Sequence, residues 1–313
     1  MRLLITGGAG FIGSNFIRYM LGSYPEYQIV NLDKLTYAGD LKNCEDFADN
    51  PNYEFVEGDI ADLKLVDKLA AKTDAIINFA AETHVDNSIL DPTEFLKTNV
   101  IGTQILLDAS KKYDHKKYVQ ISTDEVYGDI ENGMFTEDSK LKPSSPYSAS
   151  KAAGDMLCMA YFRTYGLPIN ISRCSNNYGP YQYPEKLVPF FIKKLIAGEK
   201  VPVYGDGANV RDWLHVRDHC RAIDLIYHNG MIGEVYNIGA NEEHSNLEIT
   251  KKMISILGLN EDRIEFVKDR PGHDIRYAID ASKIRNELNW EPEVDFEVGF
   301  KGVVEWYKDL FNN

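Results

Sequence analysis

Three adjacent residues, Thr123, Asp124 and Glu125, place a hydroxyl and two carboxyl groups directly after the apolar stretch 118–121. That stretch is typical of a buried strand, and in a parallel sheet the carboxyl ends of the strands open onto the ligand crevice. Two carboxyl groups there can divide the roles of acid and base if their surroundings separate their pKa values. The alternative is structural: Asp124 caps the next turn, and Glu125 is solvated.

A second pair of reactive side chains, Tyr147 and Lys151, lies in a segment with helical spacing, so both are expected on one face of a helix. A tyrosine ordinarily titrates near ~10, and acting as a base at neutral pH needs a shift of roughly three units, about 4 kcal/mol. A neighbouring ammonium group and a cationic nicotinamide can both stabilise the phenolate. Taken alone, the pair can also be a surface tyrosine beside a helical lysine.

The elements that must position these groups begin with a glycine turn. The apolar run 3–6 leads into Gly7, Gly10 and Gly13, and a helical pattern follows. Strand, glycine turn and helix together favour dinucleotide binding, because glycine lets the backbone approach a pyrophosphate and the helix N-terminus offers free N–H groups. The spacing departs from the standard Gly-x-Gly-x-x-Gly, so a tight turn without a ligand is the alternative.

The predicted strand 28–33 ends in Asp33, 20 residues after Gly13. An acid near this offset accepts from a ribose 2′-hydroxyl and repels a 2′-phosphate, which favours NAD over NADP. The adjacent Lys34 weakens this preference, because a cation can meet that phosphate. Asp59, after the third predicted strand, either accepts from the adenine amino group or caps a helix that begins near Asp62.

Further apolar runs predict a sheet that is covered on both faces. The fourth predicted strand, 75–81, ends in Ala80 and Ala81, whose small side chains let a cofactor lie close. A long helix is expected over 91–113. In the C-terminal half the pattern predicts a helix over 185–197, a strand over 201–204, a capping box from Ser245 to Glu248 and a last helix over 296–310.

Composition narrows the function classes. The 313 residues are 44% apolar and 26% charged, and the net charge is −14. An acidic chain disfavours nucleic-acid and anionic-membrane binding. The four scattered cysteines are expected to be core thiols of a cytoplasmic protein, and no secretory or membrane-spanning segment is expected. His215 and His219 lack a third ligand, so no metal is expected.

Several of these motifs together resemble those of the extended short-chain dehydrogenase/reductase family, namely residues 7–13, Asp33, Asn99 and Tyr147 with Lys151. Within that family, longer stretches are similar to the dTDP-glucose 4,6-dehydratases over essentially the whole chain: 32–39, 80–86, 123–128, 173–180 and 269–274. Thr83 departs from the serine that is common in the family, but the hydroxyl is kept.

The resemblance implies an α/β fold: a Rossmann-type doubly wound parallel sheet in an NAD-binding domain over 1–170, with re-entrant pieces near 211–240, and a smaller α/β nucleotide-sugar-binding domain over 171–313. It also implies oxidation of dTDP-glucose at C4, loss of water across C5 and C6, and hydride return to C6, in rhamnose-type deoxysugar biosynthesis. A homodimer through the helices near Pro92 and Tyr147 is implied as well.

The resemblance also implies a role for each catalytic residue. Tyr147 takes the O4 proton, and Lys151 holds the ribose and lowers the pKa of the tyrosine. Thr123 hydrogen-bonds O4, Glu125 removes the C5 proton, and Asp124 protonates the departing C6 hydroxyl.

Two sets of binding residues follow from the resemblance. The cofactor set is Gly7, Gly10, Phe11, Ile12, Gly13, Asp33, Lys34, Leu35, Thr36, Asp59, Ile60, Ala80, Ala81, Glu82, Thr98, Tyr147, Lys151 and Asn177. The substrate set is Thr83, Thr123, Asn176, Lys186, Leu187, Pro202, Val203, Tyr204, Arg211, Asn246, Asp269, Arg270 and His273. The guanidinium groups of Arg211 and Arg270 can fork a phosphate, and a surface ion pair is the alternative for each.

Two rival functions stay open. A UDP-sugar 4-epimerase or decarboxylase shares the glycine turn and the Tyr147–Lys151 pair, but it does not need Asp124 and Glu125. A nucleotide-sensing protein without catalysis has no use for either set.

Overall fold

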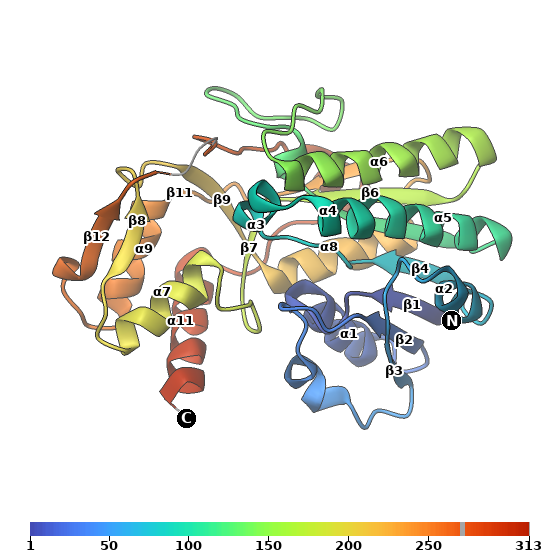
Figure 1. Ribbon diagram of the computed structural model, residues 1–313, viewed down its shortest axis with the longest axis horizontal. Helices are drawn as coiled ribbons and strands as arrows, with labels where there is room; N and C mark the ends of the chain where they lie inside the picture. The colour runs from blue at the N-terminus through green and yellow to red at the C-terminus, as the bar shows by residue number, and fades with distance from the viewer. Residues whose placement is uncertain (270–272, 313) are drawn as a thin grey trace.

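Seven parallel strands form the central sheet of the computed structural model, which describes residues 1–269 and 273–312 (Figure 1). Their order across the sheet is β10-β6-β5-β4-β1-β2-β3. The strands are β1 (Arg2–Thr6), β2 (Gln28–Asp33), β3 (Tyr53–Glu57), β4 (Ala75–Asn78), β5 (Lys117–Thr123), β6 (Ile169–Cys174) and β10 (Val235–Ile238). The order reverses beside β1, which is the switch point of a doubly wound fold. The predicted Rossmann-type sheet is therefore confirmed.

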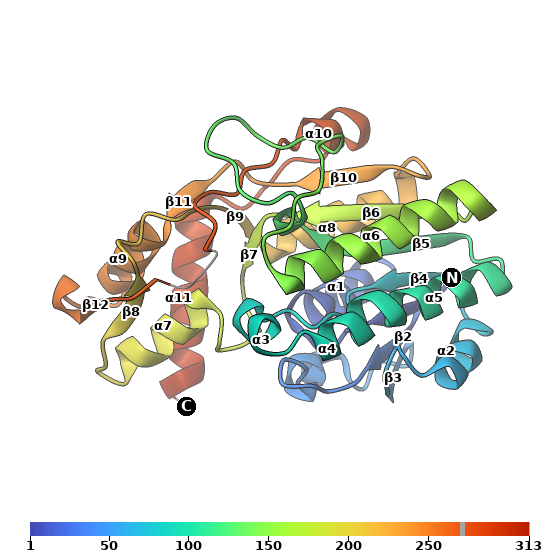
Figure 2. The same ribbon diagram turned by 45° about the horizontal axis from the view of Figure 1, so that its top comes forward.

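Helices cover both faces of this sheet. On one face α1 (Phe11–Ser23), α8 (Val216–Asn229) and α10 (Ser282–Leu288) bury one apolar cluster, and on the other α2 (Leu63–Ala70), α5 (Thr103–Lys112) and α6 (Pro146–Tyr165) bury a second. Figure 2 shows α5 and α6 side by side on the second face. Burial on both faces explains why the strands read as continuous apolar runs.

The helix expected over 91–113 is not one regular α-helix, because a π-helical segment lies within it. After α3 (Val85–Leu90), Pro92 precedes α4 (Thr93–Phe95), the π-helix η2 (Leu96–Gly102) follows, and α5 completes the rod. The wider π turn carries Asn99, whose amide accepts from the Glu82 N–H at 2.9 Å and donates to the Glu82 carbonyl at 3.1 Å. The π turn therefore holds the loop that leaves β4.

A second, smaller region packs beside the carboxyl ends of the strands. It contains α7 (Leu187–Ile196), α9 (Asn246–Ile256), α11 (Phe296–Asn312) and the short strands β7 (Asn176–Tyr178), β8 (Val201–Tyr204), β9 (Val210–His215), β11 (Glu243–Ser245) and β12 (Ile264–Val267). These elements enclose their own apolar cluster. The capping box from Ser245 to Glu248 is confirmed at the start of α9. The chain returns to the large sheet with α8 and β10, and a domain boundary at 170/171 stays a prediction.

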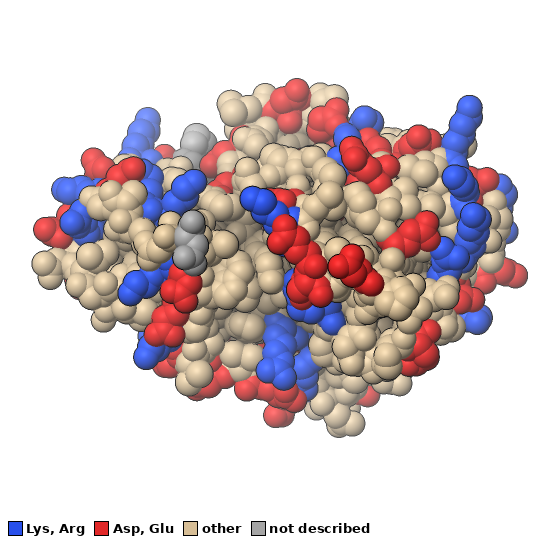
Figure 3. All heavy atoms as spheres, turned by 90° about the horizontal axis from the view of Figure 1, so that it is seen from below, with Lys and Arg blue, Asp and Glu red and all other residues tan. Residues whose placement is uncertain are grey.

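Other surface and core features agree with the composition. All four cysteines are buried free thiols, as expected. Within 1–269 and 273–312, no helix is both long and apolar enough to cross a membrane. On the face shown in Figure 3, basic side chains are scattered among acidic ones.

Candidate active site

The carboxyl ends of the seven parallel strands lie at one edge of the sheet. The parallel register pairs Thr6 with Asn78 and Thr123 with Cys174, so residues that end different strands become neighbours. A cavity of about 310 Å³ opens there between the two regions of the fold. The glycine turn lines one end of this cavity, and Asp124, Glu125, Tyr147 and Lys151 line another part of it.

The glycine turn is shaped for close approach of a ligand. Gly7 has a φ of +71°, and a Cβ there would lie 2.6 Å from the Ala80 nitrogen. A Cβ on Gly13 would lie 2.3 Å from the Gly7 carbonyl oxygen. Helix α1 begins directly after Gly10 with no acid in its first turn, so its N-terminus can receive an anion.

Asp33 lies at the cavity wall with its carboxylate held by the backbone. Its oxygens accept from the N–H groups of Ala9 and Leu35, both at 2.8 Å. Burial raises the pKa of this carboxyl, and these two hydrogen bonds oppose the rise. The glycine turn, the helix end and a fixed acid at the end of β2 together fit a dinucleotide with a free ribose 2′-hydroxyl.

The contacts of Lys34 and Asp59 bear on the two alternatives that the sequence left open beside Asp33: a cation for a 2′-phosphate and a helix cap. The ammonium group of Lys34 pairs with Asp59 at 3.0 Å and with Glu94 at 3.4 Å, so it is engaged by acids. Asp62, not Asp59, caps α2, because its side chain accepts from the N–H groups of the first helical turn. Asp59 is left on the cavity wall.

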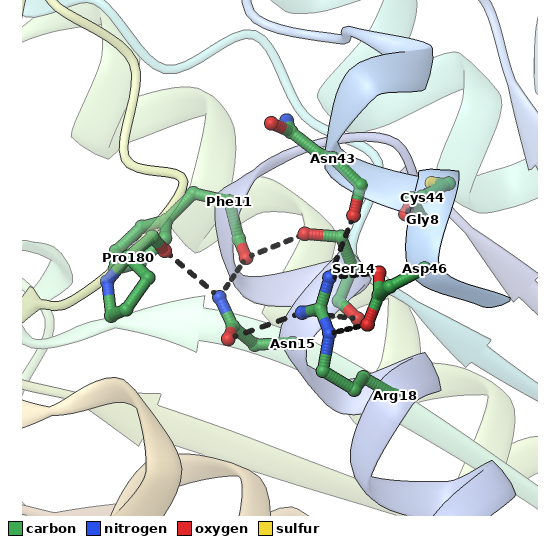
Figure 4. A network of polar contacts seen from close by, with 9 residues as sticks. All are labelled: Gly8, Phe11, Ser14, Asn15, Arg18, Asn43, Cys44, Asp46 and Pro180. Atoms are coloured by element: carbon green, nitrogen blue, oxygen red, sulfur yellow. Dashed lines mark hydrogen bonds and ion pairs between the residues drawn. The ribbon is translucent and has the colours of Figure 1, made fainter. Parts of the chain in front are cut away.

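A polar network joins α1 to segments that follow β2 and β7 (Figure 4). Arg18 of α1 donates to Asp46 at 2.7 Å and to the Asn43 carbonyl at 2.9 Å, and its guanidinium lies over the ring of Tyr181 at 4.4 Å. Asn15 donates to the Pro180 carbonyl at 3.0 Å. The segment after β7 is thereby joined to the helix that follows the glycine turn.

The turn after β5 separates its two acids. Thr123, not Asp124, caps the short helix η3 (Asp124–Val126), because its hydroxyl accepts from the Glu125 N–H at 3.2 Å. Asp124 is only 2% exposed, and burial, then repulsion from Glu125, raises its pKa to about 8. The structural alternative for Asp124 is therefore wrong: this carboxyl group is largely protonated at neutral pH and can donate a proton.

Helix α6 presents Tyr147 and Lys151 from its first two turns. Ser145 caps the helix, and the Tyr147 N–H donates to the Ser88 hydroxyl at 3.1 Å. Lys151 is buried, and its ammonium group donates to the Ile121 carbonyl at 2.7 Å. The surface alternative for this pair is wrong.

The protonation of Tyr147 differs from expectation. Burial, then repulsion from Glu125, raises the pKa of its phenol well above the ordinary value, and a hydrogen bond with Thr123 opposes the rise. That Lys151 lowers the pKa of Tyr147 stays a prediction, because the net rise shows only that desolvation of the phenolate is the largest effect on this group in the chain alone.

The structure brings most of the expected residues together. Of the cofactor set, only Leu35 lies off the cavity wall, and its backbone N–H serves Asp33. Of the substrate set, Thr83, Thr123, Asn176 and Lys186 line the cavity. The remainder lies off this wall: Leu187, Pro202, Val203, Tyr204, Arg211, Asn246, Asp269 and His273. Arg270 lies outside the described residues.

Arg211 is not in a surface ion pair. It is 5% exposed, stacks over Tyr277 at 4.2 Å, and donates to the carbonyls of Val210, Asp274 and Ile275. Contact between Arg211 and a phosphate stays a prediction.

Three cavity residues lack any distinctive sequence signal: Gln182, Tyr183 and Glu185. They follow the turn after β7, and the Lys186 ammonium group donates to the Thr83 hydroxyl at 3.1 Å across the cavity. Their position directly after the stretch 173–180 is the one hint that the sequence contains.

Comparisons with known proteins agree with this geometry. The family model described as GDP-mannose 4,6 dehydratase matches residues 4–303. The chain is 55% identical to the low-salt glycan biosynthesis protein Agl12 of Haloferax volcanii, over 98% of each chain. It is 52% identical to a dTDP-glucose 4,6-dehydratase of Streptomyces niveus, over 99% of this chain and 93% of that one.

Among solved structures, the chain is similar to the dTDP-glucose 4,6-dehydratase DesIV of Streptomyces venezuelae, crystallised with NAD and TYD. The TM-score is 0.97 at 49% identity, over 99% of this chain and 97% of that one.

Proposed function

The chain belongs to the family that the GDP-mannose 4,6 dehydratase model describes, and we propose that it converts dTDP-glucose into dTDP-4-keto-6-deoxyglucose and water with NAD as its cofactor. The family assignment makes it a dehydratase. The nucleotide, the sugar and the order of steps are the proposal.

One observation carries the choice of elimination over simple oxidation. A buried Asp124, whose pKa is raised to about 8 by burial and by Glu125, lies beside that residue in the same cavity as Tyr147. Loss of water from a sugar needs both a base at carbon and an acid at the departing oxygen, and two carboxyl groups with separated pKa values supply both.

The chain's residues then have distinct tasks. Tyr147 accepts the proton of the 4-hydroxyl, and Thr123 hydrogen-bonds O4 and helps to polarise the resulting ketone. The ketone acidifies the neighbouring C5–H, which Glu125 removes, and Asp124 gives its proton to the departing C6 hydroxyl. Bound NAD supplies the hydride acceptor and donor, and its cationic nicotinamide favours the Tyr147 phenolate that burial disfavours.

The nucleotide end of the substrate belongs, on this proposal, to the second region. Asn176 and Lys186 lie on the cavity wall. Leu187, Tyr204, Arg211 and Asn246 belong to the same second region and would bind the nucleotide beyond that wall. The preference for thymine over uracil rests on the relatives' names alone. The product would enter deoxysugar biosynthesis of the rhamnose type, in a reducing cytoplasm that suits four free thiols.

We also infer a homodimer through the helices that begin near Pro92 and Tyr147, which are the rod of α4, η2 and α5 and the helix α6; α6 packs against η2 and against the neighbouring α3. This face exposes large apolar side chains, led by Leu90 at 84% and Met156 at 66%, with Ile89, Leu96 and Ile101 beside them. Large exposed apolar side chains on neighbouring helices favour an interface between proteins.

The test compares dTDP-, UDP- and GDP-glucose as substrates for the purified protein with NAD, reading products by mass. A product lighter by one water, formed fastest from dTDP-glucose and absent in Glu125→Gln, is expected. A product of unchanged mass but altered C4 stereochemistry would favour the epimerase, and no product from any of the three sugars would favour the sensing protein.

A further inference from the structure

An ion pair is buried beneath the site and has no place in the reaction described above. The Arg173 Nε donates to the Asp155 carboxylate at 2.9 Å, and the two residues are 4% and 0% exposed. Neither side chain lines the cavity. Burying two charges costs so much desolvation that such a pair is weak evidence for a stabilising role.

The first connection runs from this pair to Lys151. Asp155 follows Lys151 by one helical turn on α6, so the two side chains share a face. Burial lowers the pKa of Lys151, and Asp155 is the first of the groups that oppose this fall. One oxygen of Asp155 is buried with no hydrogen-bond partner in the described part of the chain, so Arg173 does not satisfy the whole carboxylate.

The second connection runs from the pair to the acid turn. Arg173 also donates to the Tyr127 hydroxyl at 2.9 Å, and that hydroxyl donates to Asn237 at 2.8 Å. Tyr127 directly follows η3, and its N–H closes the turn on the Asp124 carbonyl at 2.9 Å. Helix α6, strand β6 and the turn that carries Asp124 and Glu125 are thus joined by buried polar contacts.

We propose that Asp155 is a positioning residue for the reaction: its carboxylate keeps Lys151 charged, and its pairing with Arg173 keeps the Tyr147–Lys151 helix in register with the acid turn. The buried set then holds two cations and one anion. Without Asp155, the guanidinium of Arg173 and the ammonium group of Lys151 would lose this buried carboxylate, and Lys151 is the one of the two that can lose its proton.

Other titratable groups around Lys151 do not replace this anion. On α6 they are Tyr147 and Cys158, on β6 Arg173 and Cys174, and on the turn Asp124 and Glu125. Burial raises the pKa of both thiols, so these stay neutral, and Tyr147 is the base that exchanges a proton with the substrate and is no fixed counter-ion. Asp155 is therefore the anion that α6 and β6 supply to Lys151.

The test is Asp155→Asn, measured as kcat against pH on the NAD-loaded enzyme. Because the pKa of Lys151 falls further, the alkaline limb should move down by about one pH unit, so kcat at pH values above the limb should fall about tenfold. Arg173→Gln is the matched control, because it removes the ion pair but leaves Lys151 its anion, so its alkaline limb should not move down.

A merely structural pair would give a different pattern. Asp155→Asn and Arg173→Gln would then lose activity alike, both with the wild-type pH profile, and this result would overturn the proposal. Asp155→Glu keeps the negative charge and provides a second test in case the asparagine variant misfolds. Its alkaline limb should lie at the wild-type pH, and a limb at lower pH would also overturn the proposal.

The activity readout rests on the proposed function, so a second readout is independent of it. The ¹³Cε resonance of Lys151, assigned with Lys151→Arg, should titrate at lower pH in Asp155→Asn than in the wild type. A lowered titration without any dehydratase activity would retain the role of Asp155 and refute only the proposed function. An unchanged titration would refute the role of Asp155.

Discussion

The raised pKa of Asp124 makes a prediction about stability that is independent of any substrate. The carboxyl group is buried, one of its oxygens has no hydrogen-bond partner in the described part of the chain, and its pKa is about 8 instead of the ordinary 3.8. The unfolded chain ionises this group freely above pH 4, but the folded chain does not. The unfolded state therefore binds fewer protons between these pKa values, and the wild type loses stability as pH rises through this window.

The size of the effect follows from the two pKa values. Each unit of difference is worth about 1.4 kcal/mol, so ionisation of the unfolded state costs the wild type roughly 2 kcal/mol at pH 5 and roughly 5 kcal/mol at pH 8. Asp124→Asn removes the titration and leaves a neutral group of the same shape. The unpaired amide of the variant costs about 1–3 kcal/mol, but this cost is the same at every pH. The free energy of unfolding of the variant, relative to that of the wild type, should therefore rise by roughly 3 kcal/mol between pH 5 and pH 8.

The assay is urea unfolding of both proteins at several pH values with saturating NAD. Asp138→Asn is the matched control, because the same change is made at an exposed carboxylate. The difference between Asp124→Asn and the wild type should widen as pH rises, while that of the control stays flat. A constant or narrowing difference for Asp124→Asn would mean that the carboxyl group is ionised in the folded protein, and its role as an acid would fall with it.

The remaining predictions concern the reaction, the cofactor and the interface. Tyr147→Phe should abolish reduction of bound NAD by substrate, because no group then accepts the O4 proton; appearance of the NADH absorbance at the wild-type rate would contradict this. Asp124→Asn should slow release of water more than the first oxidation, by about 10²-fold, in single-turnover experiments that follow both; equal slowing would argue against its role as acid. Arg18→Met should raise the dissociation rate of NAD several-fold, because the network around Asp46 no longer joins the segment after β7 to α1; unchanged release would exclude that role. Leu90→Asp should yield a monomer in sedimentation, and an intact dimer would place the interface elsewhere.

Local patterns were sufficient for the sheet and the cofactor turn. The glycine turn, Asp33 at the end of β2 and the apolar strand runs depend on neighbours in the chain, and their positions were predicted to within a few residues. The same holds for Tyr147 and Lys151, because helical spacing alone puts them on one face. Geometry was harder to predict within the rod 93–112, since no local signal marks the π turn that brings Asn99 to Glu82.

The protonation and burial of the site residues could not be predicted from local sequence patterns. The sequence put two acids together, but burial by distant segments decided that Asp124 is the protonated one. Arg211 lies among backbone carbonyls 63 to 64 positions away, which no spacing rule anticipates.

By itself the sequence determined which chemical groups stand at the ends of which strands, because alternation, helical periodicity and glycine turns act over a few residues. Only the tertiary structure decided which of those groups carry a charge. It buried Tyr147, which raises the pKa of its phenol, and it formed the buried ion pair between Asp155 and Arg173. The reason is that a pKa depends on desolvation and on charges brought close by folding, whatever their separation along the chain.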